Sequence, residues 1–230
     1  MAAEVFQSTI VALFLGVASV VLLRAIIPHL YQQDRRLAQF IYLDFFWIAT
    51  FFVIYLYEQS TISTIGFSLG ADPLETLVFT ILSVLVTLFL FIISARREKQ
   101  RGVISVEKGF LKVGPERVDL RMISLPGFVQ TFLMQIIWVA LPLEIFFRGY
   151  LVTRFAQSFP EFGAIIIAAI IYFVAYLDRP IFGTINILLA LVWGYSLIAT
   201  GSILPGLVAH IFINTTSFYF ARNIALSSRV

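Results

Sequence analysis

Long apolar runs alternate with short polar segments along the whole chain, and this pattern predicts membrane-spanning helices. A helix needs about 20 mostly apolar residues to cross the hydrocarbon core of a bilayer. The run at residues 126–147 can continue to Phe155, and the run at residues 162–177 is short and can extend past its apparent end. We expect an all-α bundle of about seven transmembrane helices in a single membrane domain, residues 1–230. The seven runs cover residues 6–27, 40–57, 74–95, 126–147, 162–177, 181–199 and 203–221.

Composition supports the membrane assignment and narrows the chemistry. The chain is 60% hydrophobic and only 13% charged, whereas a soluble domain is nearer half apolar and a quarter charged. There is no cysteine, which excludes disulfides and thiolate chemistry. The first apolar run is too long for a signal-peptide core and lacks a basic start, so we expect it to be a retained spanning helix.

Basic residues fall on alternate connections between the predicted spans. Arg35 and Arg36 follow the first span, the connection at residues 58–73 has no Lys or Arg, and Arg222 and Arg229 follow the last span. The positive-inside rule then predicts an outside N-terminus and a cytoplasmic C-terminus, and it explains the basic charge without a nucleic-acid partner. The connection at residues 96–125 contains Arg96, Arg97, Lys99, Arg101, Lys108, Lys112, Arg117 and Arg121.

That strongly basic connection allows two interpretations. Basic residues beside a span attract anionic lipid, so part of it can lie on the membrane surface. An ordinary solvated loop explains the same composition, and we favour it. Membrane lipid is an expected partner of the chain in either case.

Few ionisable residues lie inside the apolar runs, and such residues are functional candidates because burying them is costly. Glu144 and Arg148 are four residues apart on one span, and His210 and Asn214 have the same spacing on the last. Residues at this spacing share a helix face. One interpretation is structural: a buried ion pair and a polar bond between helices. The other is catalytic, because a carboxylate, an imidazole and an amide together can polarise water for hydrolysis.

The stretches LEIFFRGYL and HIFIN resemble motifs of the CPBP family of intramembrane metalloproteases, which includes type II CAAX prenyl proteases and bacteriocin-processing proteins. The family pattern is E-E-x-x-x-R, then F-x-x-x-H, then H-x-x-x-N. Glu144 and Arg148 match the end of the first part, and His210 and Asn214 match the third. The resemblance covers most of the chain, with specific motifs within residues 126–221. It implies a CPBP-like helix bundle, and by family habit a bacterial cytoplasmic membrane.

Two central positions of the family pattern are substituted. Leu143 stands where the water-activating Glu is expected, and Tyr172 and Tyr176 stand at the Phe and His positions of the second part. Leucine has no proton chemistry, and a neutral phenol is a poor metal ligand. A catalytic zinc normally has three protein ligands, whereas His210 is the one family ligand that the sequence retains. We therefore expect no zinc unless the site is rearranged.

Three functions remain open at the level of sequence. The first is a catalytically degenerate CPBP protein that serves as a scaffold or accessory subunit beside a membrane-protein partner. The second is an intramembrane endopeptidase of altered mechanism that acts on membrane-associated proteins. The third is a lipid- or small-molecule-binding protein that uses the former catalytic cavity. Both missing groups belong to the hydrolytic machinery, so we favour the first.

Overall fold

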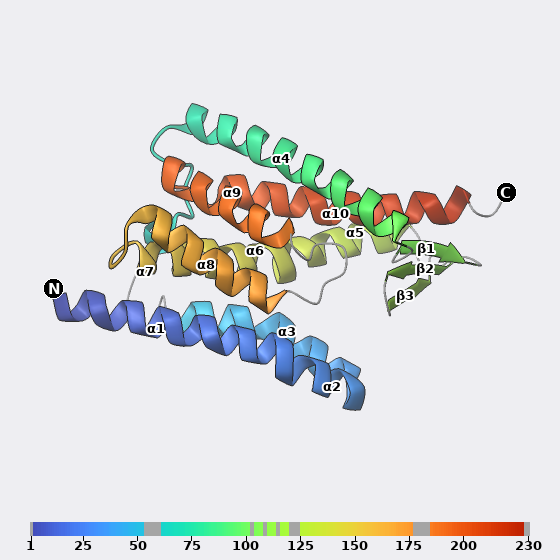
Figure 1. The fold of residues 1–230 in the computed structure, drawn as a ribbon, viewed down its shortest axis with the longest axis horizontal. Coiled ribbons are helices and arrows are strands. Elements are labelled where there is room, and N and C mark those ends of the chain that lie inside the picture. The colour runs from blue at the N-terminus through green and yellow to red at the C-terminus, as the bar shows by residue number, and fades with distance from the viewer. Residues whose placement is uncertain are drawn as a thin grey trace.

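The computed structural model is a bundle of long helices with a small β-sheet at one end (Figure 1). The predicted helical membrane bundle is confirmed, and each predicted span falls on a helix. Predicted span residues 53–57 and 181–184 lie outside the described part of the chain. The structure describes residues 2–52, 61–101, 104–107, 110–113, 116–119, 125–176 and 185–227.

The first three spans begin with an N-terminal helix made of three segments. In it, α1 (Ala2–Val21) continues through the π-helical segment η1 (Leu22–Ile26) into α2 (Ile27–Gln33). Pro28 lies in the first turn of α2, where the missing N–H of proline disturbs the helical hydrogen bonds and favours a local adjustment such as a π turn. Two further helices, α3 (Arg35–Thr50) and α4 (Pro73–Gln100), follow, and the short 3₁₀ helix η3 (Ile62–Ile65) precedes α4.

The fourth span is one continuous helix over residues 125–155, as the sequence allowed. It consists of α5 (Leu125–Met134), η5 (Gln135–Ala140), α6 (Leu141–Leu143), η6 (Glu144–Val152) and α7 (Thr153–Phe155), of which η5 and η6 are π-helical. Backbone angles at each junction stay right-handed helical. Every residue of η6 is buried, because α1, α3, α8 and α9 all pack against it. This segment is the central element of the bundle.

The last three spans are α8 (Glu161–Ala175), α9 (Ile185–Thr200) and α10 (Leu204–Ser227). Helix α10 packs along α4, and α9 packs between α8 and α4 (Figure 1). By length and apolar composition, three helices in the described residues can cross a membrane: Val5–Leu30, Pro73–Glu98 and Phe132–Phe155. Helices α8 and α9 are apolar but shorter.

The helix ends gather at two opposite ends of the bundle. The N-terminal half of α1 reaches the α7–α8 turn, where Thr9 Oγ1 lies 2.7 Å from Ser158 Oγ. The connection before α4 meets the α9–α10 turn, where the N–H of Ile203 donates to the carbonyl of Gly66 at 2.8 Å. The C-terminus and the sheet lie at the opposite end (Figure 1). The chain therefore alternates between the two ends, although this arrangement does not say which end faces the cytoplasm.

The basic third connection contains a sheet that the sequence did not predict. Strands β1 (Ile104–Glu107), β2 (Phe110–Val113) and β3 (Glu116–Asp119) pair antiparallel in the order β1-β2-β3. Each strand has only four residues, so period-two alternation is too short to recognise beside the long apolar runs. The side chains of residues 102–125 lie outside the described ones, so the membrane-surface interpretation of this connection stays a prediction.

Candidate functional site

The two predicted intramembrane charges lie on the fully buried segment η6. Glu144 is 0% exposed and Arg148 is 2% exposed. Their spacing of one helical turn brings Arg148 Nη1 to 3.3 Å from Glu144 Oε1. Because both charges are out of solvent, each makes the burial of the other less costly.

The imidazole of His210, on α10, completes this cluster. Its Nδ1 lies 2.7 Å from Glu144 Oε1, within hydrogen-bond distance. The structure therefore brings Glu144, Arg148 and His210 together in one cluster. The same oxygen of Glu144 faces both the imidazole and the guanidinium, so this carboxylate is already engaged within the protein.

Aromatic rings enclose the cluster. The Arg148 guanidinium carbon lies 4.2 Å from the ring centroid of Tyr172 and 4.9 Å from that of Trp193. The Trp193 ring stacks on His210 at 5.1 Å, and its Nε1 donates to Thr87 Oγ1 on α4 at 3.0 Å. Cation–π contacts of this kind replace part of the hydration that a buried guanidinium loses. Trp193 was not predicted, because an indole in an apolar run looks like ordinary packing.

The cluster leaves some polar atoms unpartnered and depends on one close backbone approach. Glu144 Oε2 and both Nη atoms of Arg148 have no hydrogen-bond partner among the described residues. Gly206, in the first turn of α10, faces the Glu144 carboxylate and Trp193. A Cβ at this position would lie 2.9 Å from Glu144 Oε2 and 3.0 Å from Trp193 Cβ. Glycine is therefore required for α10 to bring His210 close to Glu144.

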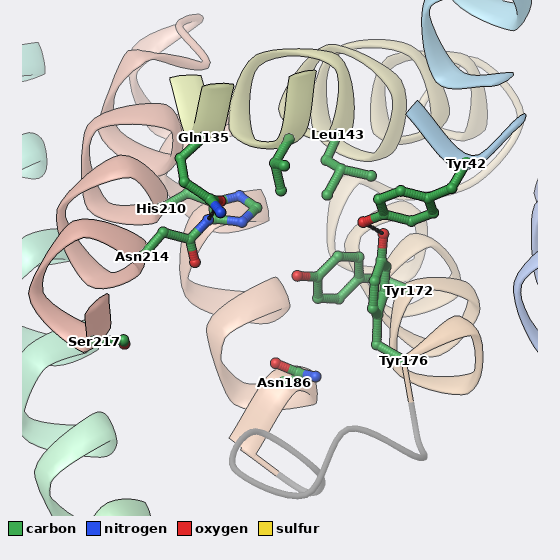
Figure 2. A pocket seen from close by; sticks show the side chains of 10 residues that line it. Tyr42, Gln135, Leu143, Tyr172, Tyr176, Asn186, His210, Asn214 and Ser217 are labelled. Atoms are coloured by element: carbon green, nitrogen blue, oxygen red, sulfur yellow. Dashed lines mark hydrogen bonds between the residues drawn. The ribbon is translucent and has the colours of Figure 1, made fainter. Parts of the chain in front are cut away.

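A cavity of about 340 Å³ lies beside the cluster (Figure 2). Five of the seven positions of the resemblance line it, whereas Glu144 and Arg148 are not among the lining residues. The fourth helix continues to Phe155, so Leu143 lies within this helix and not near its end. The lining positions are Leu143, Tyr172, Tyr176, His210 and Asn214.

The other lining residues are Tyr42, Gln135, Val139, Asn186 and Ser217, which were not predicted as site residues. Asn214 Nδ2 donates to Gln135 Oε1 at 3.1 Å, so this amide bonds to η5 and not to the cluster around Glu144. The hydroxyls of Tyr42 and Tyr176 lie 3.4 Å apart. Gln135 and Asn186 are amides inside or beside apolar runs, and the rule that intramembrane polar residues are functional candidates would have found them.

The side chains around the cavity do not fit a zinc ion. Within the described residues, no group of three or more His, Cys, Asp or Glu side chains is arranged to hold a metal. The two groups of suitable chemistry, Glu144 and His210, are hydrogen-bonded to each other. A catalytic zinc site normally has three protein ligands and an open position, and the phenols and amides that line the rest of the cavity are weak zinc ligands.

Comparison with known protein families bears on this arrangement directly. Residues 125–216 match the family described as type II CAAX prenyl endopeptidase Rce1-like. This Rce1-like segment begins with α5 and includes all seven positions that carried the predicted resemblance, so the resemblance is confirmed over this part of the chain. Residues 1–124 lie outside the match. No curated protein and no solved structure matched the chain.

The apolar helices and the Rce1-like segment show that the chain is an integral membrane protein. The similarity to CAAX-type membrane proteases covers residues 125–216. The segment supplies η6, α8, α9 and the N-terminal part of α10, and therefore the charge cluster and eight of the ten described cavity-lining residues. The other two are Tyr42 on α3 and Ser217, just past the end of the match on α10. The departures at Leu143 and Tyr176 lie within the match and on the cavity wall.

Proposed function

We propose that the chain is a non-catalytic CAAX-protease-like protein that acts as a scaffold or accessory subunit of a membrane complex. The observation that carries the proposal is the contrast between two consecutive residues. Leu143 lines the cavity and has no proton chemistry, whereas the carboxylate of Glu144 lies outside the lining and is engaged by His210 and Arg148. A general base must reach the water that it activates, and neither residue does so.

The retained charges then have a structural role. Glu144 connects η6 to α10 through His210, and Arg148 connects η6 to α8 and α9 through Tyr172 and Trp193. These contacts fix the relative positions of four helices. A buried polar cluster of this kind favours one packing arrangement over alternatives, at some cost in stability.

The proposed role requires membrane surroundings and a membrane-protein partner. Helices α1 and α4 expose large apolar side chains along their length, among them Phe14 and Phe89, and such faces suit lipid or partner helices. We place the chain in the bacterial cytoplasmic membrane with the N-terminus outside and the C-terminus in the cytoplasm. The distribution of basic residues supports this orientation.

Two assays test the proposed role. The purified chain should release no product from a fluorogenic CAAX-type peptide above the level of an inactive control membrane protein prepared identically. Purification in mild detergent should recover a second membrane protein in stoichiometric amount. Cleavage that is lost in Glu144→Gln, or recovery of the chain alone from its native membrane, would overturn the proposal.

A second function, a metal-free endopeptidase of altered mechanism, is favoured by one observation. The carboxylate of Glu144 holds Nδ1 of His210 while that imidazole lines the cavity, and a carboxylate-oriented imidazole is a suitable general base. In that reaction, Nε2 takes a proton from water while the water oxygen attacks the peptide carbonyl, and the imidazolium then gives this proton to the leaving amine nitrogen as the C–N bond breaks. Cleavage that is lost equally in Glu144→Gln and His210→Ala, and is unchanged by a metal chelator, would support this second function.

A further inference from the structure

We propose that the cavity is a binding site for a small uncharged molecule that carries an amide-like group on a flat aromatic body. The juxtaposition that points to it is an imidazole and amide side chains beside tyrosine rings, with no Asp, Glu, Lys or Arg among the described lining residues. This proposal does not depend on whether the protein hydrolyses peptides. A cleavage assay tests the proposed non-catalytic role, and the binding measurement below tests the ligand site.

The cavity wall excludes charged ligands. Its ten described lining residues include no Asp, Glu, Lys or Arg. Among the described residues, Glu144 and Arg148 lie outside the lining and pair with each other at 3.3 Å. A charged ligand would lose its hydration without gaining a counter-ion, and this cost is several kcal/mol for an ion, on the order of a thousandfold or more in affinity before relaxation.

Hydrogen-bonding groups on the wall select an amide-like ligand. His210 Nδ1 is engaged by Glu144 Oε1 at 2.7 Å, so Nε2 is the ring nitrogen that remains for a ligand in the cavity. Asn186 is 5% exposed, lines the cavity, and makes no side-chain hydrogen bond to a described residue. Its amide supplies both a donor and an acceptor. A ligand with its own donor and acceptor can therefore hydrogen-bond to Asn186 and to His210 from within the cavity.

The shape of the ligand follows from the aromatic wall and the volume. The rings of Tyr172 and Tyr176 lie 4.9 Å apart, and both face the cavity (Figure 2). Aromatic rings bind flat apolar groups by offset or edge contacts. A cavity of about 340 Å³ is at the lower end of the range for small-molecule sites, so the ligand is small.

Three probes of the same shape test the proposal: benzamide, benzoate and benzamidinium, which are neutral, anionic and cationic at pH 7. Binding to the full-length protein in detergent is measured by titration calorimetry. Benzamide should bind saturably, and each charged probe should bind at least about tenfold more weakly. A charged probe within threefold of benzamide, or benzamide binding that does not saturate, would overturn the proposal.

Two variants locate the site and change its selectivity. Asn186→Leu, close in size, should weaken benzamide binding about tenfold while the melting temperature confirms that the protein is folded. Leu143→Glu adds a carboxylate to the wall and should reverse the preference, so that benzamidinium binds more tightly than benzamide; Leu143→Gln is its matched neutral control. Unchanged binding of all three probes in the folded Leu143→Glu protein would place the probes elsewhere and overturn the proposal.

Discussion

Leu143 and Glu144 are consecutive residues with opposite surroundings. Leu143 faces the cavity where the family pattern has its water-activating acid, and Glu144 points into the bundle. The sequence predicted that Glu144 pairs with Arg148, because a spacing of four residues places both on one helix face. It did not reveal which groups from other helices meet that face. Trp193 and Gly206 contribute directly, yet a tryptophan and a glycine in apolar runs carry no recognisable signal.

Gly206 provides a test of the close approach between α10 and η6. Gly206→Ala should destabilise the protein by about 1–3 kcal/mol, because the added methyl group overlaps Glu144 Oε2 and the rigid Trp193 Cβ. Gly163→Ala on α8 is the matched control, since its Cβ would meet only ordinary contacts at 3.8 and 3.9 Å, and helix propensity makes it neutral or slightly stabilising. Unfolding in detergent measures both. Equal stability of the two variants would contradict this packing.

The Glu144–Arg148 pair makes a second prediction at this scale. Glu144→Gln should cost about 3–5 kcal/mol, because it leaves the Arg148 guanidinium buried without a counter-ion. Combination with Arg148→Met should recover part of that loss, since the unpaired charge is then gone. A double-mutant cycle in equilibrium unfolding measures the coupling. Additive effects would mean that the two side chains do not interact in the folded protein.

At the scale of elements, hydrophobic run length predicted where the helices lie but not their details. The runs marked every span, and the structure confirms the continuation of the fourth helix to Phe155. The π-helical segments η5 and η6 were not predicted, because no residue propensity distinguishes them from an α-helix. The sheet at β1–β3 was missed because its strands are only four residues long.

The contact between η6 and η3 can be tested with a single cysteine, because the chain has none. A Cβ on Gly149 would lie 2.7 Å from the Ile65 carbonyl oxygen, so Gly149→Ala should displace η3. Ile65 is buried, and Ile65→Cys should therefore react slowly with a maleimide. Adding Gly149→Ala should raise that rate several-fold, and adding Gly163→Ala should not. An unchanged rate in the first case would refute the contact.

For the whole molecule, the two ends of the bundle carry different connections. The N-terminus, the α7–α8 turn and the α9–α10 turn share one end, and the sheet and C-terminus share the other (Figure 1). Successive connections therefore lie at alternate ends of the bundle, as the positive-inside rule requires when basic residues fall on alternate connections. The contacts inside the bundle are the same whichever end faces the cytoplasm, so the orientation in the membrane is predicted from the positive-inside rule.

Single cysteines at exposed positions on the two ends measure the orientation. In intact cells, Gln157→Cys should react with a membrane-impermeant maleimide, and Arg101→Cys should react only after the membrane is permeabilised. Both positions are exposed in the structure, so access depends on the side of the membrane. The reverse pattern would invert the proposed topology while leaving the fold unaffected.

The central claim is that the assembled cavity lacks only the chemistry of hydrolysis. Leu143 and Tyr176 line the same cavity as His210 and Asn214, so Leu143→Glu with Tyr176→His places an acid and a second imidazole beside them. The most direct measurement is the rate of CAAX-peptide hydrolysis, with zinc supplied, for the unaltered protein and this double variant, with Leu143→Gln plus Tyr176→Asn as the matched control. Our account predicts background rates for the unaltered protein and the control, and a rate above background for the double variant. Hydrolysis by the unaltered protein that His210→Ala abolishes would contradict it.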